Sequence, residues 1–154
     1  MANTEDSEKF RRFALAFLKE AKEDLEIAKD LLEDKRYSRV VYFSQQCIEK
    51  SVKALLEMER IFVAEHDLST FFVKFIYNNK EYFSFKKELN TILEALDYFE
   101  GEWSKTRYPR EKEGKVITPS ELYKIEDASN SIEKVNKTFD LIKQILSKKF
   151  GLIF

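Results

Sequence analysis

Four polar side chains that could bind an anionic ligand recur at helical spacing near the end of the first third of the chain. Gln46, Glu49, Lys50 and Lys53 are three or four residues apart, so a helix through them places all four on one side. Lysine ammonium groups can meet phosphates, and a glutamine amide can hydrogen-bond a base. The same spacing also describes an exposed helix face with a Glu49–Lys53 ion pair worth about 0.2–0.5 kcal/mol. Both interpretations are therefore open.

A second candidate binding segment is the run Thr-Arg-Tyr-Pro-Arg at residues 106–110, which lies in a loop predicted over residues 104–117. Arg107 and Arg110 carry forked donors that suit phosphate oxygens, and Tyr108 offers a ring face for a base. Pro109 restricts Tyr108 to an extended backbone. The loop has a local net charge of +3, and long loops in compact domains are often functional.

The chain contains a single histidine, His66, which Asp67 and Leu68 follow at the expected start of a helix. A histidine can act as a general base or bind a metal, but at such a position a cap or turn is the commoner use. Catalysis also needs an orienting partner and a substrate pocket, and the sequence reveals neither. Arg60 and His66 are separated by five residues and form the alternative catalytic pair.

Several chemistries are disfavoured by what the sequence contains. It has no phosphate-binding glycine loop, no dinucleotide fingerprint, and no zinc-protease or serine-hydrolase motif. With one cysteine and one histidine, neither a disulfide nor a zinc site is expected, so we predict no metal and no cofactor. The net charge of −1 argues against broad non-specific binding to nucleic acid.

These residues must be positioned by long helices, because the chain has only three glycines and two prolines. Apolar residues at three- and four-residue steps predict helices over residues 6–34, 38–60, 67–77 and 85–103. Ser38 is a candidate cap for the second helix, and Asp67 or His66 for the third. Gly101 could end the fourth helix early.

The last helix has the clearest boundaries. Thr118 is placed to cap it, Pro119 suits its first position and Gly151 suits its end. An uninterrupted helix over 119–150 would be about 48 Å long. The prediction is an all-α fold: an antiparallel bundle of about five helices forming one domain over residues 1–154.

The composition also indicates where the protein works. No apolar run reaches membrane-spanning length and the N-terminus is polar and acidic, which predicts a cytoplasmic protein without a signal peptide. The many lysine, glutamate, phenylalanine and isoleucine residues, with few glycines, are typical of a thermophile.

Four segments together resemble the HEPN family (higher eukaryotes and prokaryotes nucleotide-binding). They are the run Ala-Lys-Glu-Asp-Leu-Glu-Ile-Ala at 21–28, the run Tyr-Phe-Ser-Gln-Gln-Cys-Ile-Glu-Lys-Ser-Val-Lys-Ala-Leu-Leu at 42–56, His-Asp-Leu at 66–68 and Thr-Arg-Tyr-Pro at 106–109. The second run is the most specific. The resemblance extends over residues 15–148.

The resemblance implies an antiparallel bundle that commonly forms a homodimer. It also implies one of two roles: a partner of a minimal nucleotidyltransferase in a two-component, toxin–antitoxin-like module, or a metal-independent ribonuclease. The ribonucleases use an arginine and a histidine near the start of the last helix, and this chain has no histidine after His66.

The main hypothesis is therefore a non-catalytic nucleotide-binding or accessory subunit with a nucleotide or a nucleotidyltransferase as partner. Its binding residues would be Gln46, Lys50, Lys53, Arg107, Tyr108 and Arg110, gathered in one pocket. The alternatives are a ribonuclease that uses Arg60 and His66, and a purely structural dimerising module whose long last helix and apolar end at 152–154 contact a second copy.

Overall fold

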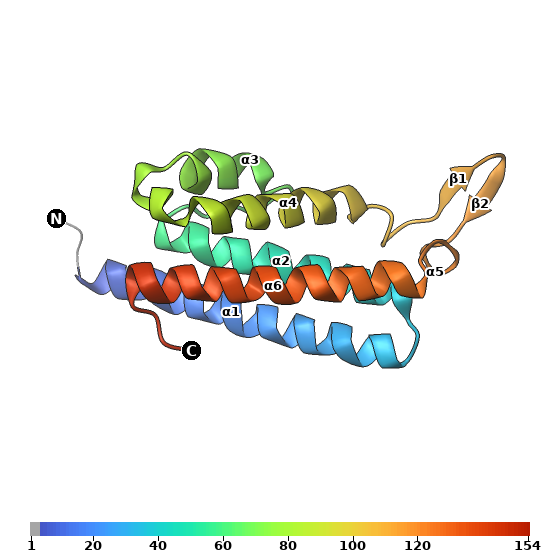
Figure 1. Cartoon of the computed structure of the whole chain (residues 1–154), viewed down its shortest axis with the longest axis horizontal. Helices are drawn as coiled ribbons and strands as arrows, with labels where there is room; N and C mark the ends of the chain where they lie inside the picture. Colours follow the sequence, from blue (N-terminus) through green and yellow to red (C-terminus); the bar gives the residue numbers. More distant parts are fainter. Residues whose placement is uncertain (1–3) are drawn as a thin grey trace.

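The computed structural model describes residues 4–154 and is mostly helical, with a small β-hairpin (Figure 1). The expected all-α bundle is confirmed. Three long helices run side by side along the long axis, and a shorter fourth helix lies over them. The elements in chain order are α1 (Thr4–Glu33), α2 (Tyr37–Met58), α3 (Ser69–Phe72), a π-helical turn (Val73–Tyr77), a 3₁₀ turn (Lys80–Phe85), α4 (Lys86–Glu102), β1 (Arg110–Lys112), β2 (Lys115–Ile117), α5 (Pro119–Leu122) and α6 (Ile125–Phe150).

Helix α2 is the central element, because it packs against α1, α4 and α6. Neighbours on three sides bury most of its residues, including polar ones that an exposed helix would turn to solvent. Gln45 and Glu49 are 3% and 6% exposed. Buried polar groups of this kind must find hydrogen-bond partners inside the protein, and those partners define the site described below.

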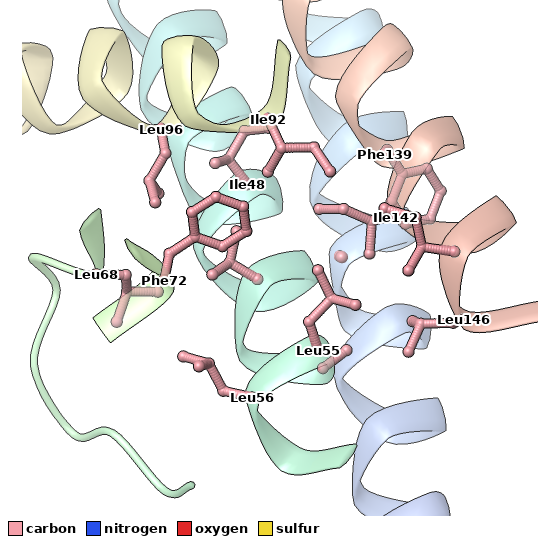
Figure 2. Close-up of a cluster of buried hydrophobic side chains, with 14 of the residues drawn as sticks. Ile48, Leu55, Leu56, Leu68, Phe72, Ile92, Leu96, Phe139, Ile142 and Leu146 are labelled. Carbon is pink, nitrogen blue, oxygen red and sulfur yellow. The ribbon is translucent and has the colours of Figure 1, made fainter. Parts of the chain in front are cut away.

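The hydrophobic core lies where α2, α4 and α6 face one another (Figure 2). Leu55 and Ile142 point into the space between α2 and α6, and Phe72 brings α3 against the same cluster. All three side chains are fully buried. Full burial of such side chains stabilises the fold by roughly 1.5–3 kcal/mol each, so the core fixes how α4 and α3 sit on α2.

The last helix is shorter than the sequence predicts, because the chain breaks at Tyr123 and Lys124. These two residues have extended backbones and separate the four-residue α5 from α6. Tyr123 turns inward, and its hydroxyl donates to Glu102 at 2.5 Å. Asp127 accepts a hydrogen bond from the Lys124 backbone N–H and so caps the new helix start. Helix α6 therefore begins six residues after Pro119 and ends, as expected, at Gly151, whose φ is 68°.

The region predicted as a plain loop over 104–117 contains the antiparallel hairpin β1–β2. The residues of its tight turn, Glu113 and Gly114, have φ values of 53° and 75°, which is the backbone that a two-residue hairpin turn requires. The strands are only three residues each and almost fully exposed. In Figure 1 the hairpin projects beyond the end of the bundle.

Other helix boundaries differ by a few residues. The residue before α2 is Arg36 rather than the expected cap Ser38, and Leu68 precedes α3 in place of Asp67 or His66. Gly101 does not end α4, which continues to Glu102. No helix in the described range 4–154 is long and apolar enough to cross a membrane.

Glu100 joins the end of α4 to the start of α3. Its carboxylate oxygen Oε1 accepts the backbone N–H groups of Leu68 and Ser69 at 2.6 and 2.7 Å. The side chain thereby satisfies two donors that a helix start leaves unpaired. Burial outweighs these hydrogen bonds and raises the pKa of Glu100 from 4.5 to about 7.

Replacing Glu100 should therefore change how stability depends on pH. The folded state holds the Glu100 proton more tightly than the unfolded chain does. Protonation of Glu100 therefore stabilises the fold below pH 4.5, and this stabilisation is lost as pH rises through about 7. In Glu100→Gln we expect the free energy of unfolding to fall less between pH 5 and pH 8 than in wild type. After allowance for solvent screening the difference should be on the order of 1 kcal/mol.

Urea unfolding at both pH values measures this difference. The exposed Glu94, on the same helix, is the matched control, and Glu94→Gln should keep the wild-type pH dependence. If the free energy of unfolding depends on pH equally in wild type and in Glu100→Gln, the raised pKa of Glu100 would be contradicted.

Candidate functional site

Arg107 lies between two aromatic rings at the point where the chain leaves α4 and returns to α2. Its guanidinium carbon is 4.4 Å from the centroid of the Tyr42 ring and 4.2 Å from that of Trp103. One guanidinium nitrogen donates to Gln45 Oε1 at 2.9 Å and the other to the Trp103 carbonyl at 2.9 Å. Contacts of this kind between a cation and a ring face hold the guanidinium plane in place.

The backbone between α4 and β1 forms the turn that presents Arg107. The N–H of Thr106 bonds to the carbonyl of Glu102, and the N–H of Tyr108 bonds to that of Ser104. Thr106 is fully buried, and its hydroxyl donates to the Trp103 carbonyl at 3.0 Å. The turn thus brings a segment more than sixty residues away along the chain onto the polar side of α2.

Arg107 has no carboxylate bonded to it directly. Partial burial lowers the pKa of its guanidinium, whereas the charge of Glu49 behind it acts in the opposite direction. Its hydrogen-bond acceptors, on Gln45, Trp103 and Thr106, are uncharged. Arg39, from the first turn of α2, donates to the carbonyl of Thr106 at 3.3 Å. Over residues 4–154 neither arginine forms an ion pair with a carboxylate. Two neighbouring cations without a directly bonded carboxylate favour an anionic ligand.

A hollow of about 540 Å³ opens beside these arginines. Its lining residues combine the two guanidinium groups with aromatic rings: Arg39, Tyr42, Phe43, Thr106, Arg107 and Tyr108. Tyr108 is 58% exposed at its edge. We call this space the arginine hollow. Its lining offers forked donors for phosphate oxygens and ring faces on which a planar base can stack.

Glu49 is the centre of a hydrogen-bonded network behind the arginine hollow. Its Oε2 accepts the Gln45 amide at 3.1 Å, while its Oε1 accepts Lys53 at 3.1 Å and lies 2.9 Å from His66 Nδ1. Since Gln45 also accepts Arg107, the network runs from the loop at 107 through α2 to the segment at 66. The buried carboxylate orients the imidazole, which itself is 57% exposed.

A second hollow, of about 410 Å³, lies next to His66. Its lining residues are His66, Asp67, Glu100, Trp103 and Ser104, and we call it the acidic hollow. Trp103 connects the two hollows: its ring lies 5.3 Å from the His66 ring, centroid to centroid, and also contacts Arg107. Among the residues that line the acidic hollow there is no lysine or arginine.

The predicted ligand residues of α2 already have partners inside the protein. Lys50 bonds to Asp24 of α1 at 2.6 Å, and Lys53 bonds to Glu49 at 3.1 Å. The Gln46 amide donates to Gln45 at 3.0 Å. Gln46 and Lys53 thus belong to the network, whereas Lys50 is paired outside it. The Glu49–Lys53 pair is the one that the helical spacing indicates.

The predicted loop residues are divided between two places. Arg107 and Tyr108 line the arginine hollow, whereas Arg110 lines a separate hollow of about 330 Å³ with Lys105, Lys112 and Tyr123. The division follows from the hairpin, because β1 carries Arg110 away from the bundle.

The alternative catalytic pair, Arg60 and His66, has no partner in common. Arg60 donates to Ser7 of α1 at 3.3 Å and its guanidinium lies over the Phe10 ring, whereas His66 contacts Glu49 and Trp103. Within residues 4–154 no group of three or more histidine, cysteine, aspartate or glutamate side chains is arranged to hold a metal ion.

Four site residues were missed by sequence reasoning: Arg39, Tyr42, Gln45 and Trp103. Arg39 and Tyr42 are three positions apart in the first turns of α2, a spacing that places them on one side. Gln45 continues that row. Trp103 gave no signal, because an aromatic residue at a helix end is most often part of the core.

Comparison with known proteins identifies the family. The HEPN domain profile matches residues 14–145. A relative from Methanocaldococcus jannaschii, named "Putative toxin MJ1304", is 38% identical over 148 residues, which cover 96% of this chain and 97% of that protein.

A solved structure described as ST0689, an archaeal HEPN homologue, has a similar fold. Its TM-score is 0.64 at 26% identity, and the match covers 85% of this chain and 95% of that one. The fold, the family profile and the archaeal relative agree, and the chain belongs to the HEPN domain family.

Proposed function

We propose that this protein is a nucleotide-binding module whose arginine hollow holds the phosphate of a nucleotide, with aromatic rings beside it on which the base can stack. The observation that carries the proposal is the partly buried Arg107, which is bonded only to neutral acceptors. An incoming phosphate would supply the missing negative charge through charge-assisted hydrogen bonds. Arg39, which also lines the hollow, would contribute a second forked donor.

Aromatic groups on the same hollow support a nucleotide rather than a bare anion. Tyr108 stands exposed at the rim, and its ring centroid is 6.2 Å from that of Trp103. A base stacked on an aromatic ring gains roughly 1–3 kcal/mol. In this proposal Arg107 and Tyr108 contact the ligand, Arg110 extends the positive surface along β1, and Gln46 and Lys53 hold the network behind Arg107. Lys50 pairs with Asp24 of α1 outside that network.

We further propose that the module works in a two-component, toxin–antitoxin-like system with a nucleotidyltransferase as partner. The named toxin among its relatives supports the first part, and the family resemblance supports the second. A homodimer would be built from the apolar residues left on the surface, of which Phe13, Ile153 and Phe154 are 48%, 88% and 58% exposed. If the chain were a purely structural dimerising module, it would dimerise without binding nucleotides.

The first prediction concerns phosphate binding. Wild-type protein should bind AMP and GMP, and the bound ligand should raise its melting temperature in a concentration-dependent manner. Arg107→Ala should weaken binding roughly tenfold or more, because a charge-assisted hydrogen bond contributes about 1.5–3 kcal/mol. Isothermal titration calorimetry gives both affinities.

Lys50→Ala is the matched control. Lys50 is paired with Asp24 and does not line the arginine hollow, so this variant should lose some thermal stability but bind nucleotides with nearly wild-type affinity. A larger loss of affinity in Lys50→Ala than in Arg107→Ala would place the phosphate elsewhere on α2.

A second candidate function, ribonuclease activity, is favoured by one observation: the 2.9 Å contact between Glu49 and His66 at the edge of a hollow. A carboxylate that holds one imidazole nitrogen leaves the other to act as a general base. His66 would take the proton of an RNA 2′-hydroxyl, the 2′-oxygen would attack phosphorus, and the 5′-oxygen would leave and take a proton from water.

If that activity exists, single-stranded RNA should be cleaved in the presence of EDTA to 2′,3′-cyclic phosphate ends. His66→Ala should then lower the rate by about a hundredfold or more, as measured on denaturing gels. Arg60→Ala tests whether His66 acts with Glu49 or with Arg60. The cleavage rate should stay unchanged if Glu49 is the functional partner of His66. RNA that stays intact with the wild-type protein would eliminate this candidate.

A further inference from the structure

The acidic hollow differs in charge from the arginine hollow next to it. Its ionisable lining groups are two carboxyls and one imidazole, and Trp103, which also lines it, contacts Arg107 of the arginine hollow. A phosphate would be repelled here, so the acidic hollow must suit another part of a ligand. Groups that donate hydrogen bonds without carrying negative charge fit this lining.

Its two carboxyl groups, Asp67 and Glu100, line the same hollow. Burial raises the pKa of Glu100, and the nearby Asp67 side chain raises it further. Glu100 is held in position by the two backbone N–H groups at the start of α3, and Asp67 is held by the Ser69 hydroxyl at 3.3 Å. Both acceptors are therefore fixed before any ligand arrives, which reduces the entropy cost of binding.

Trp103 links the acidic hollow to Arg107 of the arginine hollow. The Arg107 guanidinium and the His66 ring both contact Trp103, at 4.2 and 5.3 Å from its rings. A phosphate on Arg107 would therefore leave the attached base within reach of the Trp103 wall and the carboxyls beyond it. Ser104, at the rim between them, adds a hydroxyl that can donate or accept.

We propose that the acidic hollow recognises guanine, so that the module selects guanine nucleotides. The inference rests on the proposed function, since Arg107 must hold the phosphate. Guanine presents two adjacent donors, N1–H and the N2 amino group, which can meet both carboxyls. In adenine and cytosine the amino group lies next to an unprotonated ring nitrogen, which is an acceptor. In uracil a carbonyl lies on each side of the N–H. Each of these bases would therefore place an acceptor against a carboxylate, which is repulsive.

The test compares GMP, IMP and AMP at pH 8, where the Glu100 carboxyl is ionised. Trp103 is the only tryptophan in the chain, so its fluorescence reports binding at the wall between the hollows. GMP should bind roughly tenfold or more tightly than AMP, because a site built to hydrogen-bond a ligand rejects one that leaves it unpaired. IMP, which has N1–H but no amino group, should fall between them.

Two variants separate this inference from the proposed function. Asp67→Asn replaces one acceptor with an amide of the same shape. It should lower the affinity for GMP and leave the affinity for AMP almost unchanged. Arg107→Ala should lower the affinities for GMP, IMP and AMP by the same factor. Asp67 is exposed and lies outside the core, so the variant should fold, as a melting curve would verify.

The outcomes are distinct. Equal affinity for GMP and AMP in wild type, or an equal loss of both in Asp67→Asn, would overturn guanine selection while leaving phosphate binding in place. No binding of any of the three nucleotides would overturn the proposed function and the guanine site with it.

Discussion

The buried carboxylate of Glu49 is the constraint on which the site depends. A carboxylate that is only 6% exposed in the middle of α2 needs several donors to offset the cost of leaving water. It obtains them from Gln45, Lys53 and His66. Through these donors one buried charge fixes the segment that carries His66 on one side and, by way of Gln45, the Arg107 loop on the other.

The central position of α2 explains why such a network exists in this fold. A helix with neighbours on three sides has no fully solvated face, so Gln45 and Glu49 find hydrogen-bond partners in one another and in the segments that cross over them, while the buried Ser44 hydroxyl has no hydrogen-bond partner among the described residues. Ser51 meets the same constraint locally, since its hydroxyl donates to the Cys47 carbonyl at 2.6 Å. The polar side of α2 is thus part of the interior, and the binding surface is built from the loops that cover it.

Trp103 divides this covered region into two chemically different halves. The arginine side has cations with neutral hydrogen-bond partners, and the acidic side has two carboxyls, of which Glu100 accepts two backbone N–H groups. With cations on one side of the Trp103 indole and carboxyls on the other, the site is complementary to a ligand that has an anionic end and a hydrogen-bond-donating end. The helices of the HEPN fold position the segments at 59–68 and 103–108, which contribute lining residues to the two hollows.

The sequence alone determined the helical bundle, because long apolar stripes with few glycines and prolines leave little choice of fold. It also singled out Arg107 and Tyr108, which line the arginine hollow, and the helix end at Gly151, since their local chemistry is explicit. Tertiary structure decided the rest. The break at Tyr123 depends on its bond to Glu102, and the role of Glu49 depends on His66 and Arg107 arriving from other segments. Contacts between residues far apart in the chain leave no periodic trace, so only the packed bundle could show which polar groups meet and which are left for a ligand.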